Sequence, residues 1–94
     1  MNQNMSIMVV DDELVVRESL YHWFDREDYH VETASSGDEA LKKLMKSNFD
    51  VLFVDMKMPG MSGFELLKKT KELYPDAAVV IITAYGSIDT AVKA

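Results

Sequence analysis

The stretch VLFVDMKMPG, residues 51–60, decides the fold of this chain. It opens with four apolar residues, runs directly into Asp55 and soon reaches Pro59 and Gly60. Short apolar runs without polar alternation are typical of strands that are buried on both faces, as in parallel sheets covered by helices. Since packing alone does not favour a carboxylate at the end of a buried strand, we expect Asp55 to belong to a functional site.

Three further segments predict strands. Residues 6–10 (SIMVV) and 78–82 (AVVII) are apolar runs of the same kind as 51–54. Residues 29–33 (YHVET) alternate apolar and polar side chains, which is typical of an edge strand with one wetter face. The sequence therefore predicts four strands.

Helical patterns lie between these strands. Three stripes of apolar residues recur at a spacing of three to four: Val16, Leu20, Trp23 and Phe24; Leu41, Leu44 and Met45; Phe64, Leu67, Leu73 and Tyr74. Two Ser-x-x-Glu motifs, at residues 36–39 and 62–65, predict capping boxes at helix starts. Residues 87–94 begin like a helix at Ser87. We interpret Trp23 as a partly buried anchor of the first helix.

The alternation of strands and helices predicts an α/β fold, a doubly wound parallel sheet with right-handed crossovers. We assign residues 1–94 to a single domain, because a chain of 94 residues is too short for two cores. The strand at 78–82 is as apolar as the central ones, yet no further strand follows it. We therefore expect a domain that is incomplete at its C-terminus and that self-associates through this exposed edge.

The composition excludes several classes of function. A formal net charge of -6 argues against direct binding of nucleic acid, which requires clustered Lys and Arg. The chain has no cysteine, so it has neither a disulfide framework nor a thiolate metal site. No apolar stretch approaches the roughly 20 residues that span a bilayer. We expect a cytoplasmic protein with no membrane contact.

Acidic residues follow two of the predicted strands. Asp11 and Asp12 follow residues 6–10, and Asp55 follows residues 51–54. In a doubly wound sheet the carboxyl ends of the strands form the ligand-binding edge, so the three carboxylates converge if the two strands are neighbours. Their repulsion is relieved by a shared cation, and oxygen ligands of this type suit Mg²⁺ with phosphate oxygens completing its shell. The sequence predicts a site for Mg²⁺ and a phosphoryl group.

Each of these residues also has a plainer interpretation. Asp11 and Asp12 alone would suit a helix start, and Asp55 alone would suit a turn before Pro-Gly. Thr83 follows the strand at 78–82, where its hydroxyl can donate a hydrogen bond to a phosphoryl oxygen or simply end the strand. No glycine-rich GxxxxGK[ST] loop is present, so ATP binding is not indicated.

Three motifs together resemble the receiver domain of two-component response regulators: VVDDE (9–13), FVDMKMPGMSG (53–63) and VIITAYGS (80–87). The similarity extends over residues 6–94, and the last segment resembles receivers of nitrogen-regulator-type transcription activators. The resemblance implies the flavodoxin-like strand order 2-1-3-4-5. It also implies a lysine at the end of a fifth strand, which this chain lacks.

The resemblance assigns a role to individual residues. Asp55 would accept a phosphoryl group from a sensor histidine kinase, with Mg²⁺ held by the three acids and by the backbone carbonyl of Lys57. Thr83 and Ala84 would form the switch, and Pro59 and Gly63 the loop before the third helix. The domain would catalyse only its own phosphorylation and dephosphorylation, and it would control a covalently linked output domain in transcription regulation.

Two other functions remain open at this stage. The chain would serve only for protein–protein contact or oligomerisation if it is not phosphorylated in this form. A phosphatase with an aspartate nucleophile is less well supported, because that chemistry requires an acid where this chain has Lys57.

Overall fold

The structure, a computed structural model, describes residues 5–56, 58 and 60–82. In chain order its elements are β1 (Ser6–Val10), α1 (Leu14–Arg26), β2 (His30–Ala34), α2 (Gly37–Lys46), β3 (Val51–Asp55), α3 (Gly63–Leu73) and β4 (Ala78–Ile82). The predicted alternation of strands and helices is confirmed over this range. The helix expected at 87–94 lies outside the described residues.

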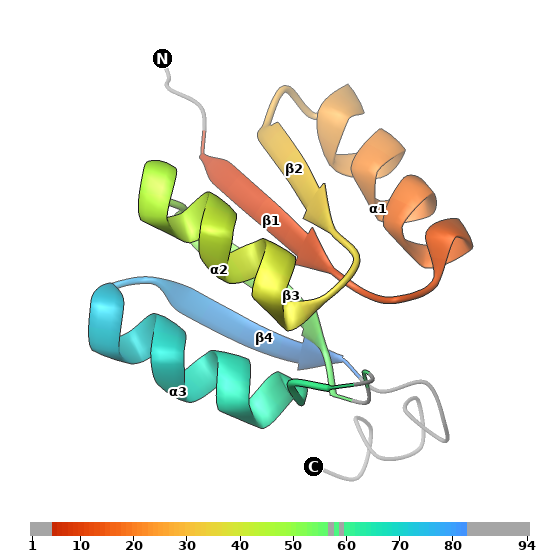
Figure 1. The fold of residues 1–94 in the computed structure, drawn as a ribbon. Coiled ribbons are helices and arrows are strands. Elements are labelled where there is room, and N and C mark those ends of the chain that lie inside the picture. The colour runs from red at the N-terminus through yellow and green to blue at the C-terminus, as the bar shows by residue number, and fades with distance from the viewer. Residues whose placement is uncertain (1–4, 57, 59, 83–94) are drawn as a thin grey trace, which may run out of the picture.

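The four strands form one parallel sheet in the order β2-β1-β3-β4. Helices α2 and α3 cover one face, and α1 lies on the other (Figure 1). This is the predicted doubly wound α/β fold, with β1 and β3 as direct neighbours at its centre. No helix in the described ranges is long and apolar enough to cross a membrane.

The strand boundaries differ from the sequence prediction at three places. Strand β3 continues through Asp55, and β2 begins at His30 and ends at Ala34, one residue later at each end than the predicted 29–33. Tyr29 belongs to the turn after α1, because its amide donates to the carbonyl of Phe24 at 3.3 Å. Asp28, the residue before it, has a positive φ of 69°. Strand β2 does lie at the edge of the sheet, as its alternating pattern predicted.

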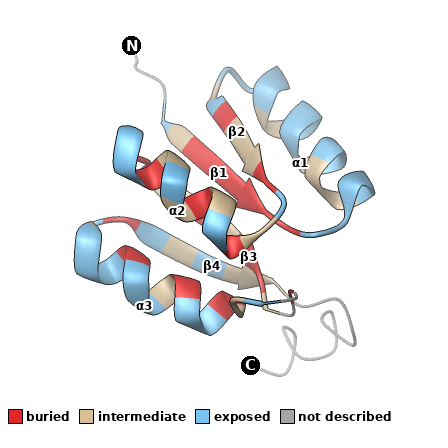
Figure 2. Ribbon diagram, viewed as in Figure 1, coloured by how far each residue is buried: buried red, intermediate tan, exposed pale blue. Residues whose placement is uncertain are grey.

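Side chains of the two central strands alternate between two cores. Met8 and Val10 of β1 pack on the side of α2 and α3 together with Leu52 and Val54 of β3. Ile7 and Val9 of β1 pack instead with apolar residues of α1. Figure 2 shows the result, with buried residues concentrated in β1 and exposed ones on the outer surfaces of the helices. Burial on both faces explains why these strands are continuously apolar.

The apolar stripe predicted for α1 is only partly correct. Phe24 stacks on Phe53 of β3 with ring centroids 5.1 Å apart, and Leu20 packs against the same core. Trp23 is 59% exposed, so its predicted role as a partly buried anchor is wrong. The centroid of its ring lies 5.7 Å from that of the Phe24 ring. The periodicity identified the helix but not which of two adjacent positions faces the sheet.

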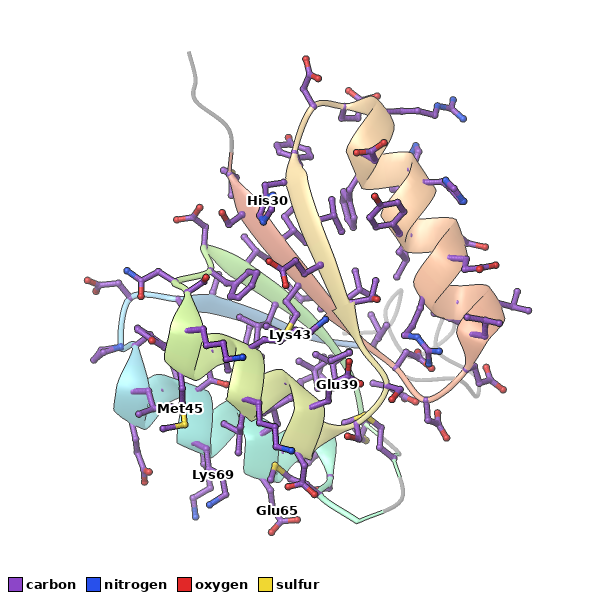
Figure 3. All side chains as sticks on the ribbon, turned by 45° about the horizontal axis from the view of Figure 1, so that its top comes forward. His30, Glu39, Lys43, Met45, Glu65 and Lys69 are labelled. Carbon is purple, nitrogen blue, oxygen red and sulfur yellow. The ribbon has the colours of Figure 1, made fainter. Side chains whose placement is uncertain are left out.

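The stripes of α2 and α3 contain similar errors. On α2, Leu44 is fully buried, whereas Met45 is 76% exposed on the outer surface (Figure 3). On α3, Phe64 and Leu73 are exposed, and Leu66 and Thr70 take the buried positions. The Thr70 hydroxyl has no hydrogen-bond partner among the described residues. A buried threonine in place of a larger apolar residue hid the true stripe of α3.

One of the two predicted capping boxes is complete. At the start of α3, the Ser62 hydroxyl accepts from the Glu65 amide, and the Glu65 carboxylate accepts from the Ser62 amide, both at 3.2 Å. At the start of α2, the Ser36 hydroxyl accepts from the Glu39 amide at 3.1 Å. The Glu39 carboxylate binds the neighbouring Ser35 instead, so the second box is only half formed.

Gly63 allows α3 to begin directly against the end of β3. The sequence prediction placed Gly63 in the loop before the third helix. In the structure it is the first residue of α3. A Cβ added here would lie 2.6 Å from the carbonyl oxygen of Asp55 and 2.9 Å from Cα of Met56. The Gly63 amide donates to the Met56 carbonyl at 3.1 Å. A side chain at this position would displace the backbone that carries Asp55.

We predict that Gly63→Ala destabilises the domain by about 1–3 kcal/mol, the usual range for forced overpacking. The measurement is urea unfolding followed by circular dichroism. Phe64→Ala is the matched control, because Phe64 is the exposed neighbour on the same turn, and its expected effect is within about 0.5 kcal/mol. Equal effects of the two substitutions would contradict the close approach inferred at Gly63.

Candidate functional site

Three carboxylates converge where β1 and β3 end. Val10 pairs with Val54 in the parallel register, so the residues that follow them, Asp11 and Asp55, reach the same edge of the sheet. Ligand oxygens of Asp11, Asp12 and Asp55 all lie within 4.8 Å of one another. The convergence expected from the sequence therefore occurs. Separation in this range matches a group of side chains that can share one cation.

The three acids differ in their exposure to solvent. Asp11 and Asp55 are 5% and 6% exposed, whereas Asp12 is exposed. Two buried carboxylates beside an accessible one form a site that a small cation can enter from solvent. Hard oxygen donors of this number suit Mg²⁺, which takes one or two carboxylates and retains several waters.

Asp11 is held by hydrogen bonds to its amide, its carbonyl and its carboxylate. Its amide donates to the Ala34 carbonyl of β2 at 3.1 Å. Its carboxylate oxygen Oδ1 accepts from the Glu13 amide at 2.9 Å, and its carbonyl accepts from Arg17 Nη1 at 2.7 Å. Arg17 was not recognised in the sequence, since a contact to a main-chain carbonyl leaves no pattern of charges.

Burial raises the pKa of the Asp11 carboxyl above its ordinary value, and the negative charges of Asp12 and Glu13 raise it further. The hydrogen bond from the Glu13 amide and the positive charge of Arg17 act in the opposite direction. The net direction is upward, so ionised Asp11 is held in an environment that disfavours its charge. A bound divalent cation would reverse that balance.

The remaining residues assigned from the sequence lie mostly outside the described part of the chain. Lys57, Pro59, Thr83 and Ala84 are all in this class. Ile82, the residue before Thr83, pairs with Asp55 in the register of β3 and β4. Its carbonyl accepts from the Met56 amide at 2.9 Å. The end of β4 therefore lies directly beside Asp55.

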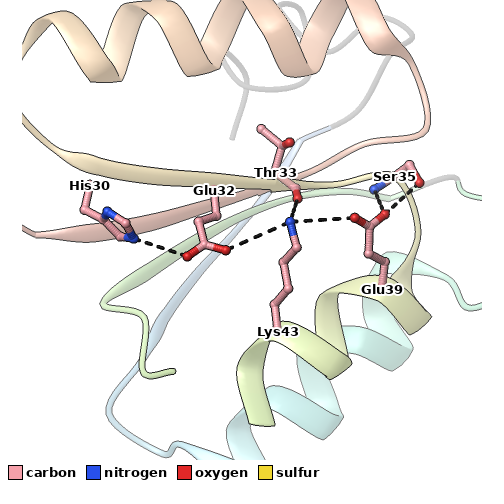
Figure 4. A network of polar contacts seen from close by, with 6 residues as sticks. All are labelled: His30, Glu32, Thr33, Ser35, Glu39 and Lys43. Atoms are coloured by element: carbon pink, nitrogen blue, oxygen red, sulfur yellow. Dashed lines mark hydrogen bonds and ion pairs between the residues drawn. The ribbon is translucent and has the colours of Figure 1, made fainter. Parts of the chain in front are cut away.

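A polar network links β2 to α2 next to this edge (Figure 4). Lys43 Nζ donates to the Thr33 carbonyl at 2.5 Å and lies 3.6 Å from Glu39 Oε2 and 3.9 Å from Glu32 Oε1. The spacing of four residues between Glu39 and Lys43 was the one available signal of this contact.

The same network fixes the chain between β2 and α2. The Glu39 carboxylate accepts from both the amide and the hydroxyl of Ser35 at 2.8 Å. These hydrogen bonds, with the nearby charge of Lys43, lower the pKa of Glu39. Ala34, which accepts from the Asp11 amide, lies between Thr33 and Ser35. The network therefore supports the backbone that positions Asp11.

We predict that Asp11→Asn raises the melting temperature of the metal-free domain at pH 7 by a few degrees. The folded-state pKa of Asp11 is raised, so its ionised form destabilises the fold above the unfolded-state pKa. This destabilisation is complete above the folded-state pKa, and it disappears as the pH falls through that pKa toward the unfolded-state pKa. One kcal/mol corresponds to about 4–8 °C in a domain of this size. Calorimetry in the presence of a chelator measures the difference.

Asp76→Asn is the control for this substitution, because Asp76 is exposed in the turn before β4. It is expected to leave the melting temperature almost unchanged. The difference between wild type and Asp11→Asn should shrink in acidic buffer. A lower melting temperature for Asp11→Asn at pH 7 would show that the ionised carboxylate stabilises the metal-free fold.

Comparison with known proteins places this geometry in a family. The family model described as response regulator receiver domain matches residues 7–94. Among solved structures, the Vibrio cholerae chemotaxis protein CheY4 superposes with a TM-score of 0.86 and 32% identity, over 97% of this chain and 78% of that one. The response regulator TrrA of Thermotoga maritima, solved in complex with Mg(2+)-BeF, has a TM-score of 0.81 and 38% identity, over 92% of this chain and 75% of that one.

Curated relatives agree. Sporulation initiation phosphotransferase F of Bacillus subtilis is 40% identical over 86 residues, which are 92% of this chain and 69% of that protein. Transcriptional regulatory protein ZraR of Klebsiella oxytoca is 38% identical over 96 residues, which are 98% of this chain and 21% of that protein. The chain thus spans about two thirds of one relative and a fifth of the other. Its sequence motifs, its sheet order and its acidic site all agree with the family match, and the chain belongs to the response regulator receiver domains.

Proposed function

We propose that Asp55 is the residue of this chain that accepts a phosphoryl group from a sensor histidine kinase. Receiver domains are the phosphoacceptors of two-component systems, and their homologues here include a phosphotransferase. One observation carries the proposal: the carboxylates of Asp11, Asp12 and Asp55 lie within 4.8 Å of one another at the ends of β1 and β3. Of these three acids, Asp55 is the last residue of β3, and its place in the motif FVDMKMPGMSG (53–63) is what assigns it the acceptor role.

The donor set fits Mg²⁺. In this proposal Asp12 and Asp55 bind the ion directly, Asp11 holds its water, and the Lys57 backbone carbonyl adds a further ligand. When bound, Mg²⁺ neutralises the charge that develops on the transferred phosphoryl group. The burial of Asp55 limits the access of bulk water to its carboxylate, and the negative charges of Asp11 and Asp12 beside it favour a cation over an anion. A metal-dependent reaction follows from this arrangement.

The transfer itself requires little from the protein beyond positioning. An oxygen of the Asp55 carboxylate forms a bond to phosphorus as the bond from phosphorus to the donor atom breaks, and the donor leaves with that electron pair. We propose that the Thr83 hydroxyl then donates a hydrogen bond to the new phosphoryl group, with Ala84 leaving space beside it. Pro59 and Gly63 shape the segment before and at the start of α3. The chain would catalyse only this self-modification and its reversal.

The biological setting follows from the relatives. ZraR and the Bacillus subtilis protein ResD are transcriptional regulatory proteins of which this chain spans 21% and 33%. We propose that residues 1–94 are part of a receiver domain that controls a covalently linked output domain in transcription. The last motif, VIITAYGS (80–87), favours an activator of the nitrogen-regulator type. A cytoplasmic location is part of the same proposal, because it is consistent with response regulators generally.

An interaction module without phosphorylation is less favoured. A module of that kind does not require a cluster of three acids, two of them buried, because buried carboxylates are unfavourable unless a partner compensates them. A solved relative was also obtained in complex with Mg(2+)-BeF. The phosphatase alternative has no support from the family match.

We predict a single phosphoryl adduct when the domain is incubated with acetyl phosphate and Mg²⁺. Intact-mass spectrometry measures it directly. Asp55→Asn and a sample with excess chelator should each show none, because the first removes the nucleophile and the second the cation. Asp76→Asn, a distant exposed acid, should be labelled like wild type. An adduct that persists in Asp55→Asn would assign the acceptor to another residue.

We also propose that the chain self-associates through β4. Among the described strands, β4 pairs with β3 alone, and its residues are apolar and exposed or half-buried. An apolar edge strand is a template for pairing with another chain. Light scattering over a concentration series is expected to show an increasing mean mass, and a Val80→Lys variant should reduce the increase. A monomer at every concentration would contradict the proposal.

A further inference from the structure

The peptide that joins Asp11 to Asp12 carries two of the three clustered acids, so its orientation decides where both carboxylates point. Its carbonyl oxygen, that of Asp11, accepts a hydrogen bond from Arg17 Nη1 at 2.7 Å. The adjacent Asp11 amide and carboxylate are held by Ala34 and Glu13. Arg17 therefore supplies the side-chain contact that fixes this peptide on its α1 side.

Arg17 directs its guanidinium at a main-chain carbonyl and not at a carboxylate. Arginine normally pairs with carboxylates, often through two parallel hydrogen bonds. Within the described residues Arg17 makes no ion pair, although Asp11, Asp12 and Glu13 lie close in sequence. Arg17 is half-buried and lines a pocket together with Thr33 of β2. Its donor is directed at the main chain.

We propose that Arg17 is a positioning residue that fixes the Asp11–Asp12 peptide and so holds both carboxylates toward Asp55 for binding a divalent cation. This inference rests on the proposed function. Arg17 does not touch the phosphoryl group or the cation in this account. It acts through the geometry of the two acids.

Two effects of Arg17 on the affinity for the cation have opposite signs. Its positive charge repels a divalent ion, so a role of charge alone predicts tighter binding when Arg17 is removed. Its hydrogen bond preorganises the ligands, so a positioning role predicts weaker binding. The sign of the change in affinity therefore distinguishes the two roles. A purely structural role would lower the metal-free stability and leave the affinity of the folded protein unchanged.

Isothermal titration with Mg²⁺ alone tests the proposal on wild type, Arg17→Met and Arg17→Lys. Arg17→Met keeps the apolar stem but removes both charge and donor, and we expect its dissociation constant to rise about three- to ten-fold. Arg17→Lys keeps the charge and one donor group but lacks the planar fork, so its affinity should lie between the other two. Lysine keeps the positive charge that repels the cation. If Arg17→Lys binds Mg²⁺ more tightly than Arg17→Met does, only the hydrogen bond explains the difference.

Arg26→Gln is the matched control, because Arg26 is exposed at the far end of α1, and it should bind Mg²⁺ like wild type. Melting curves without metal establish that each variant is folded. If Arg17→Met does not fold, wild-type affinity in Arg17→Lys overturns the proposal. If Arg17→Met folds, an affinity for Mg²⁺ that equals or exceeds that of wild type also overturns the proposal. Absence of Mg²⁺ binding in wild type would instead refute the metal site of the proposed function.

Discussion

Electrostatic repulsion among three carboxylates is the constraint on which the rest of this structure depends. Asp11, Asp12 and Asp55 place their ligand oxygens within 4.8 Å of one another, and two of the three are buried. Like charges so close in a partly buried site are unfavourable unless a cation compensates them. Apolar packing of the sheet and hydrogen bonds at its edge hold the three acids in place and stabilise the fold.

The sheet provides that stability. Strands β1 and β3 are neighbours in parallel register and are covered on both faces by apolar cores, which fixes the positions at which their chains emerge. The contacts at the edge then refine the direction of each acid. Gly63 lets α3 approach the Asp55 backbone, and Arg17 binds the carbonyl of Asp11. The Lys43 network braces the end of β2, which in turn accepts from the Asp11 amide.

The features predictable from the sequence were those with a repeating pattern. Continuous apolar runs identified three of the strands, although only β1 and β3 are largely buried and β4 is exposed or half-buried. The acids that follow 6–10 and 51–54 identified the edge where β1 and β3 end. Helix faces were less predictable, since Met45 and Phe64 satisfy the periodicity but are exposed, and Thr70 is buried without being apolar. Arg17 and Lys43 were missed because both donate to main-chain carbonyls, and nothing in the sequence identifies such an acceptor. The roles of Lys57, Thr83 and Ala84 still rest on the resemblance to the family.

The most direct test of the central claim is a crystal structure of the domain grown with Mn²⁺ as a substitute for Mg²⁺, with anomalous scattering used to locate the ion. Mn²⁺ shares the preference for carboxylate and water oxygens. We expect one anomalous peak between the carboxylates of Asp12 and Asp55, with Asp11 nearby. An empty cluster at saturating Mn²⁺, or a peak bound only by other residues, would contradict the claim that these acids are held together in order to bind a cation.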